Sequence, residues 1–143
     1  MFNNLINNTM KKILILAVFA LVTIEVNAQK MTDGKVPSAV KESFAKQYPN
    51  VKTVKWDKED AGYEASFKMD GKDMSVVFDG KGIEKEVETD IKFSELPMPV
   101  QTALKGKKVK EAAVIKKGGK IFYEAEVGGK DLLFEANGKT VKM

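Results

Sequence analysis

Three residue types that carry much of protein chemistry are absent from this 143-residue chain. It has no cysteine and no histidine, and all 24 of its basic residues are lysine, so arginine is missing as well. A disulfide scaffold, a thiolate nucleophile and a zinc site of the usual kind are therefore excluded. The chain also lacks the neutral-pH proton shuttle that histidine provides and the bidentate clamp that arginine provides.

The remaining side chains do not form a recognisable catalytic constellation. Carboxylates, lysines, tyrosines and serines can catalyse, but none of the serines lies in the strand-to-turn context of an activated nucleophile. These serines are Ser38, Ser43, Ser66, Ser75 and Ser94. We therefore expect no enzymatic activity and no cofactor.

The charge balance also argues against a nucleic-acid partner. The net charge is +4, but lysines and carboxylates alternate along the chain, and arginine, the preferred residue for reading phosphates and bases, is missing. We expect no nucleic-acid binding.

Residues 1 to 28 have the pattern of a secretion signal. Lys11 and Lys12 precede an apolar run, residues 13–24, that ends before the small-residue motif Val26-Asn27-Ala28. We predict cleavage after Ala28, a periplasmic or extracellular location and no membrane attachment after cleavage. An uncleaved anchor is the alternative, and translation could start at Met1 or at Met10.

The chain repeats itself about sixty positions apart. Tyr63-Glu64-Ala65 recurs as Tyr123-Glu124-Ala125, and Val36-Pro37 recurs as Leu96-Pro97. A unit of this size buries so little surface that it would be only marginally stable alone without disulfides, so the copies should share one body. We predict a flexible leader at residues 29–35, a first repeat at 36–92 and a second repeat at 93–143.

Each repeat should contain one helix followed by strands. Val40, Phe44 and Tyr48 recur every four residues between Pro37 and Pro49, which predicts a short amphipathic helix. The apolar period then changes to two, and Asp-Gly and Gly-Gly pairs separate the alternating segments as hairpin turns. In the second repeat we expect a helix near 97–106 and strands near 109–116, 120–127, 130–136 and 139–143. The predicted fold class is α+β, with two tandem repeats that each have a helix and a three- to four-stranded antiparallel meander, and helices packed on one face of the sheet.

This pattern resembles a known bacterial family. The motif residues are Val36, Pro37, Val40, Phe44, Tyr48, Pro49, Trp56, Tyr63, Glu64, Ala65, Leu96, Pro97, Tyr123 and Glu124. With them, the chain from Val36 onward resembles the PepSY-like family of small exported proteins. The resemblance implies a tandem fold similar to the beta-lactamase inhibitor protein, and it implies no enzymatic activity. One departure is Lys107-Lys108, which stands where a Tyr-Pro pair would end the second helix.

Strand parity predicts a candidate partner surface. In the second repeat the outward positions include an apolar group among carboxylates, and Val77 is the one apolar outward residue of the first repeat. The predicted partner surface consists of Ala113, Ile115, Phe122, Leu133 and Val77. Such a patch is typical of a docking site for a protein or peptide. A β-bulge that reverses the parity, or a terminal segment that covers the patch, is an equally weighted alternative.

Three other groups of residues are candidate sites. Tyr48, Trp56 and Tyr63 could line a cavity for a small apolar or anionic ligand, although a place in the core is the favoured interpretation. The pairs Glu64/Glu84 and Glu124/Glu126 could share a sheet face, where solvated charge is ordinary. Asp57, Glu59 and Asp60 do not have calcium-loop spacing, so no metal site is predicted.

The function we expect is an exported, non-catalytic binding module that inhibits or regulates another envelope or secreted protein. The alternative is a periplasmic carrier of a small apolar or anionic ligand. The identity of any partner and the oligomeric state are not encoded in a readable pattern.

Overall fold

The computed structural model of the protein describes residues 29–30, 35–60 and 62–142. The predicted signal peptide and most of the predicted leader lie outside these ranges. Within them, no helix is long and apolar enough to cross a membrane.

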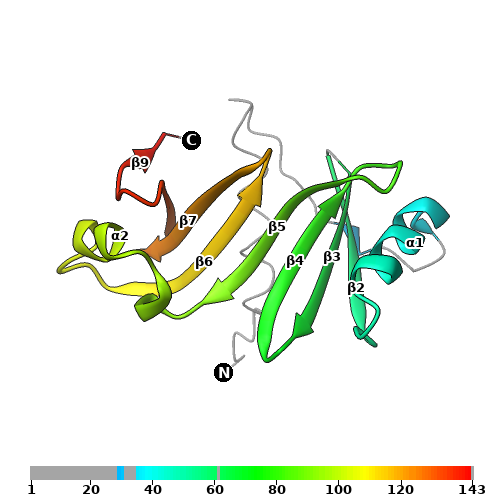
Figure 1. The fold of residues 1–143 in the computed structure, drawn as a ribbon, viewed down its shortest axis with the longest axis horizontal. Helices are drawn as coiled ribbons and strands as arrows, with labels where there is room; N and C mark the ends of the chain where they lie inside the picture. The colour runs from blue at the N-terminus through cyan, green and yellow to red at the C-terminus, as the bar shows by residue number, and fades with distance from the viewer. Residues whose placement is uncertain (1–28, 31–34, 61, 143) are drawn as a thin grey trace, which may run out of the picture.

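One continuous antiparallel sheet of nine strands, in chain order, runs through the molecule (Figure 1). Its strands are β1 (Gln29–Lys30), β2 (Val54–Glu59), β3 (Gly62–Met69), β4 (Lys72–Phe78), β5 (Glu84–Ile91), β6 (Val109–Lys117), β7 (Lys120–Val127), β8 (Lys130–Phe134) and β9 (Thr140–Val141). Sequential hairpins connect most of the neighbours, because Gly-containing turns allow the sharp reversals that a meander needs. Strands β5 and β6, which are separated by a longer connection, are also paired, so the sheet is not interrupted between the repeats.

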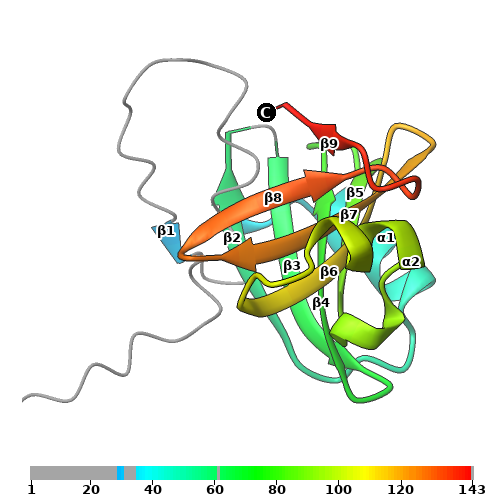
Figure 2. The same ribbon diagram turned by 90° about the vertical axis from the view of Figure 1, so that its left-hand side faces the viewer.

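Two short α-helices lie on the same side of this sheet (Figure 2). Helix α1 (Ser38–Gln47) precedes β2, and helix α2 (Met98–Ala103) follows a single 3-10 turn, η3 (Phe93–Glu95). Both helices begin directly after a proline whose carbonyl oxygen accepts two backbone N–H bonds, at Pro37 and at Pro97. Proline suits this position because it has no N–H to leave unpaired and its φ is already helical.

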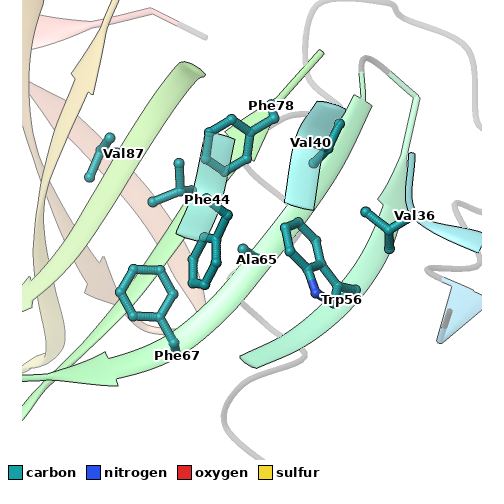
Figure 3. Close-up of a cluster of buried hydrophobic side chains, with 9 residues drawn as sticks. Val36, Val40, Phe44, Trp56, Ala65, Phe67, Phe78 and Val87 are labelled. Carbon is teal, nitrogen blue, oxygen red and sulfur yellow. The ribbon is translucent and has the colours of Figure 1, made fainter. Parts of the chain in front are cut away.

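Each helix lays its apolar side chains on its own part of the sheet. Phe44 of α1 lies at the centre of the first core, where its ring meets Trp56 and Phe67 edge to face at centroid distances of 5.4 and 5.1 Å (Figure 3). Val100 and Leu104 of α2 pack with Phe134 in a second core. The first core consists of Val36, Val40, Phe44, Trp56, Ala65, Phe67, Val76, Phe78 and Val87, and the second of Leu96, Val100, Leu104, Ala112, Ala125 and Phe134.

Two turns of the same kind, one in each half of the sheet, lie against the two helices. Gly82 follows β4 and Gly138 follows β8, both with positive φ, and each donates its N–H to the residue three positions earlier. A Cβ on Gly82 would overlap the carbonyl oxygen of Ala39, and one on Gly138 would lie 2.6 Å from that of Pro99. Because the hairpin backbone touches the first turn of the helix, only glycine fits these two positions.

The structure confirms the predicted antiparallel sheet with helices and corrects several boundaries. Gln29 and Lys30, expected in a loose leader, form β1 and pair with β2. The predicted strand 130–136 ends at Phe134, and the last strand is only Thr140–Val141.

A bulge between Val77 and Phe78 changes the parity of β5. Phe78 pairs with Glu84, whereas Val77 pairs with Glu86. Glu84 therefore lies on the helix side, where the Tyr48 hydroxyl donates to it at 3.3 Å. The expected Glu64/Glu84 pair on one face is wrong for this reason.

Replacing Gly82 by alanine should destabilise the protein far more than an equivalent change at an open turn. Gly71 has a similar positive φ, but nothing lies within 4 Å of the position its Cβ would take. Gly71→Ala should lower the free energy of unfolding by about 1 kcal/mol through backbone strain alone. Gly82→Ala should lower it by about 3 kcal/mol, because the clash with α1 is added to the strain. Urea denaturation measures both, and equal losses would contradict the close approach.

Candidate functional site

The sheet face opposite the two helices is the candidate site. We call it the helix-free face, and the strand register defines its residues, because they alternate with those of the two cores. They include Lys55, Asp57, Glu64, Ser66, Ser75, Val77, Glu86, Glu88, Ala113, Ile115, Phe122, Glu124, Glu126 and Leu133.

Carboxylates dominate this face. In the described part of the chain, every buried polar or charged side chain is a carboxylate, and all of them project from this side of the sheet. They are Asp57, Glu59, Glu64, Glu86, Glu88, Glu124 and Glu126. The sequence analysis treats charge on a sheet face as solvated, but Glu64, Glu86 and Glu88 are buried. Negative charge is therefore concentrated on one surface of a protein whose net charge is positive.

Lysines neutralise some of these carboxylates. Lys55 lies 2.7 Å from Asp57, and Lys117 lies 2.7 Å from Glu86. Lys110 lies 3.5 Å from Glu126. All three lysine side chains are at least one-third exposed, so these pairs are screened by water on one side and contribute modestly to stability.

Several buried carboxylates have an oxygen that receives no hydrogen bond from the described residues, among them Oε1 of Glu59 and Oε2 of Glu64. The corresponding oxygens of Asp57 and Glu86 lie beside the lysines named above. Burial raises the pKa of Glu64, and burial together with the negative charges of Glu64 and Asp57 raises the pKa of Glu59 to about 7. A buried carboxylate without a donor is destabilising when ionised, which is why burial raises the pKa of both groups.

The face contains two concave regions of different size. Glu88, Asp90, Glu111, Glu124, Glu126 and Asp131 surround a space of only 10 Å³. Burial and the nearby charges of Glu126 and Glu111 raise the pKa of Asp131 there. A larger hollow of 320 Å³ lies over Ser66 and Ser75, between Lys55, Lys68, Glu64 and Glu88. Only the larger hollow has room for more than a single water molecule.

The predicted apolar partner surface lies on the helix-free face, but it is less exposed than expected. Ile115 pairs with Phe122, and Ala113 pairs with Glu124, which pairs with Leu133. Ala113 and Ile115 are buried, whereas Phe122 and Leu133 are half-buried. Val77 is also buried and lies two strands away on β4, between Glu64 and Glu86. The register brings the first four together and leaves Val77 apart.

The three residues proposed to line a ligand cavity are divided by the fold. Tyr48 and Trp56 line a shallow hollow of 220 Å³ on the helix side, together with Phe44 and Val54. Tyr63 packs against the first core, with the Lys58 ammonium 4.1 Å from its ring centre. Burial and Glu84 raise the pKa of Tyr48 to about 12.

No metal centre emerges from the carboxylates. Across residues 35–60 and 62–142, no group of three or more is arranged to hold a metal ion. Asp57 and Glu59, considered as ligands before a turn, instead lie within β2. The sequence analysis places Glu124 and Glu126 on one sheet face, which the register confirms, but it does not anticipate that these carboxylates are buried.

Glu59 should make the protein less stable as the pH rises. Its folded pKa of about 7 exceeds the ordinary value of 4.5, so the unfolded chain releases this proton first. The free energy of unfolding should therefore fall between about pH 4.5 and pH 7 and then level off. Glu59→Gln should flatten this decline and unfold at a higher temperature than the wild type at about pH 8.

Glu42→Gln, which alters an exposed glutamate of α1, is the control and should retain the wild-type pH dependence. Melting temperatures measured across this pH range provide the comparison. Parallel curves for Glu59→Gln and the wild type would contradict the assignment.

Comparisons with known proteins agree with this geometry. A family model described as "Putative beta-lactamase-inhibitor-like, PepSY-like" matches the chain twice, at residues 22–83 and 69–142. A search of curated proteins finds no match.

Three solved structures share the fold. A DUF2874 family protein from Bacteroides uniformis is 26% identical, with a TM-score of 0.69 over 74% of this chain and 86% of that one. A protein of Bacteroides eggerthii titled as one of the "putative periplasmic proteins" is 23% identical, with a TM-score of 0.70 over 75% and 86% of the two chains. A BLIP-like protein from Bacteroides fragilis is 24% identical, with a TM-score of 0.63 over 74% and 84%. The two family matches together span most of the sequence, and the chain therefore belongs to the PepSY-like family.

Proposed function

We propose that this protein is an exported, non-catalytic binding module that inhibits or regulates another envelope or secreted protein, and that it docks through the helix-free face. The observation that carries the proposal is the segregation of buried carboxylates and of Phe122 and Leu133 on that face. In this proposal, each helix and its meander form one copy of a repeated unit. The two units place their helices on one side and combine their other sides into one docking surface.

The composition of the face supports a protein partner. Interfaces combine an apolar centre, often with an aromatic residue, and a polar surround. Ile115, Phe122 and Leu133 supply the centre, and the carboxylates of neighbouring strands surround them. The negative charge disfavours a nucleic-acid backbone as the partner. The family description names an inhibitor fold and no reaction, and one structural neighbour is described as periplasmic.

Replacing an apolar residue at the centre of this face by a charged residue tests this function. Phe122→Lys should abolish capture of the partner from the native envelope fraction, because it places a charge in the apolar centre. Ile121→Lys is the matched control, since Ile121 is the adjacent residue, 51% exposed, and pairs with Lys116 on the helix side. The control should capture the partner as the wild type does.

Capture is quantified by mass spectrometry, and circular dichroism verifies the fold of both variants. A folded Phe122→Lys variant that retains full capture would sink the proposal.

The second candidate function is a carrier of a small apolar or anionic ligand. The hollow beside Tyr48 and Trp56 favours it, and Lys41 also lines this hollow. The adjacent core is filled by nine buried side chains, so the hollow is a surface depression and not an enclosed cavity between helix and sheet. An enclosed and apolar site is what carriers usually have, so this function ranks second.

Trp56 is the only tryptophan and reports directly on this hollow. If the docking function is correct, decanoate, an apolar anion, should leave the Trp56 emission unchanged at micromolar concentration. A saturable change that is lost in Tyr48→Ala would favour the carrier.

A further inference from the structure

Removal of the signal peptide would create a positive charge at the edge of the sheet. Cleavage after Ala28, the position that the sequence favours, makes Gln29 the first residue of the mature chain. Its backbone nitrogen then changes from a neutral amide to an α-amine, which is mostly protonated at neutral pH. Gln29 belongs to β1, the edge strand, so this ammonium group lies beside β2.

The register directs the Gln29 nitrogen toward the end of β2. Gln29 pairs with Lys58, Lys30 pairs with Asp57, and the two strands run in opposite directions. The N-terminal side of Gln29 therefore faces the C-terminal side of Lys58, where Glu59 follows. Long side chains reach diagonal neighbours across a pair of strands, so the Glu59 carboxylate is placed to contact this nitrogen.

Glu59 has an acceptor atom that nothing outside the protein reaches. Its side chain is only 4% exposed, and Oε1 receives no hydrogen bond from the described residues. Because Oε1 has almost no accessible surface, a ligand in solution does not contact it. A donor for this oxygen has to come from the chain itself, and leaving it without one is unfavourable when the carboxylate is ionised.

The charges that surround Glu59 are mainly negative. Glu64 of β3 and Asp57 and Asp60 on either side of it in sequence add to the effect of burial, and together they raise the pKa of Glu59 to about 7. Lys58 opposes them only in part. A further positive charge beside Glu59 would therefore be stabilising.

Lys58 does not supply that charge directly, because its side chain is engaged elsewhere. Its ammonium group donates to the carbonyl oxygen of Gly62 at 3.1 Å and lies 4.1 Å from the ring centre of Tyr63. Tyr63 packs against the first core, so Lys58 is on the helix side of β2 and Glu59 is on the other.

We propose that the α-ammonium group of Gln29, released by signal cleavage, binds the Glu59 carboxylate and holds β1 at the edge of the sheet. The proposal rests on the export that the proposed function includes, and it does not depend on the docking surface. A charge-assisted hydrogen bond is stronger than one from a neutral amide. The precursor cannot form this pair, so cleavage adds a stabilising contact as well as releasing the protein.

The ammonium group should also change how stability depends on pH. An adjacent positive charge favours the ionised carboxylate, so it lowers the folded pKa of Glu59 toward its ordinary value of 4.5. The folded and unfolded chains then release this proton over a similar pH range. The decline in stability predicted above for Glu59 therefore belongs to forms in which Gln29 carries no charge, and it should be smaller in the secreted protein.

Competitive acetylation of the secreted protein tests the pair. Trace acetic anhydride reacts only with unprotonated amines, and mass spectrometry quantifies the acetylated N-terminal peptide across a pH series. Pairing with Glu59 should raise the pKa of the Gln29 α-amine and slow its acetylation at neutral pH about tenfold. Glu59→Gln should restore the ordinary rate. Asp60→Asn, which neutralises the adjacent exposed carboxylate, is the matched control and should behave as the wild type does.

A lactam form of the same protein provides a second measurement. Glutaminyl cyclase acts on the unfolded chain, which is then refolded. The α-nitrogen of Gln29 bonds to the side-chain carbonyl carbon, and the side-chain nitrogen leaves as ammonia, so the terminus becomes neutral. This form should melt at a lower temperature than the secreted protein at neutral pH. In Glu59→Gln the two forms should melt together.

Several results would overturn the pair. They are an acetylation profile that Glu59→Gln leaves unchanged, an equal change in Asp60→Asn, and equal melting of the lactam and amine forms of the wild type. A steric block at the terminus would slow acetylation equally at every pH and in all variants. A secreted chain that begins at another residue, or that already carries the lactam at Gln29, would also overturn it.

Failure of this inference is distinguishable from failure of the proposed function. If the secreted chain begins at Gln29 but its α-amine has an ordinary pKa, export stands and the pair with Glu59 falls. If the native cells retain the chain with residues 1–28 attached, export itself fails. If the pair forms but Phe122→Lys retains full capture, the docking function fails on its own test.

Discussion

Both helices pack on the same side of one continuous sheet, and the other features of the molecule depend on this arrangement. Val40 and Phe44 of α1 and Val100 and Leu104 of α2 bury the apolar positions of the strands around them. Burying a side chain of this size contributes about 1.5–3 kcal/mol, so these contacts fix the register of every strand they touch. Because strand residues alternate between faces, the positions between the core residues are all directed to the opposite side. The glycines at 82 and 138 let the hairpins approach the helices closely enough for this packing.

The residues of the helix-free face do not belong to the two cores. The packing of the cores therefore does not determine which residue types are found on this face. Buried carboxylates with raised pKa values reduce stability at neutral pH, since ionising them without full compensation is unfavourable. Buried ionisable groups with shifted pKa values are typical of binding sites, where a partner can supply the missing interactions. Glu64, Glu88 and Asp90 line one hollow of this face.

Much of this architecture was predictable from residue spacing, because the helical and strand periods are local. The stripe of Val40, Phe44 and Tyr48 predicts α1, and alternation predicts the bounds of β7. The bulge between Val77 and Phe78 was not predictable, and it moved Glu84 to the helix side. The burial of Glu64 and Glu88 and the hollow over Ser66 and Ser75 depend on the packing of four strands together. No single segment encodes them.

The central claim is that the helix-free face is the docking surface, and the absence of cysteine allows a direct measurement of it. Ser75→Cys places one thiol on this face, and Ser38→Cys places one at the exposed start of α1 on the other side. The rate of maleimide labelling is measured for each variant with and without the captured envelope protein. The account predicts that the partner slows labelling at residue 75 and leaves residue 38 unaffected. Slower labelling at residue 38 alone, or no change at residue 75, would contradict it.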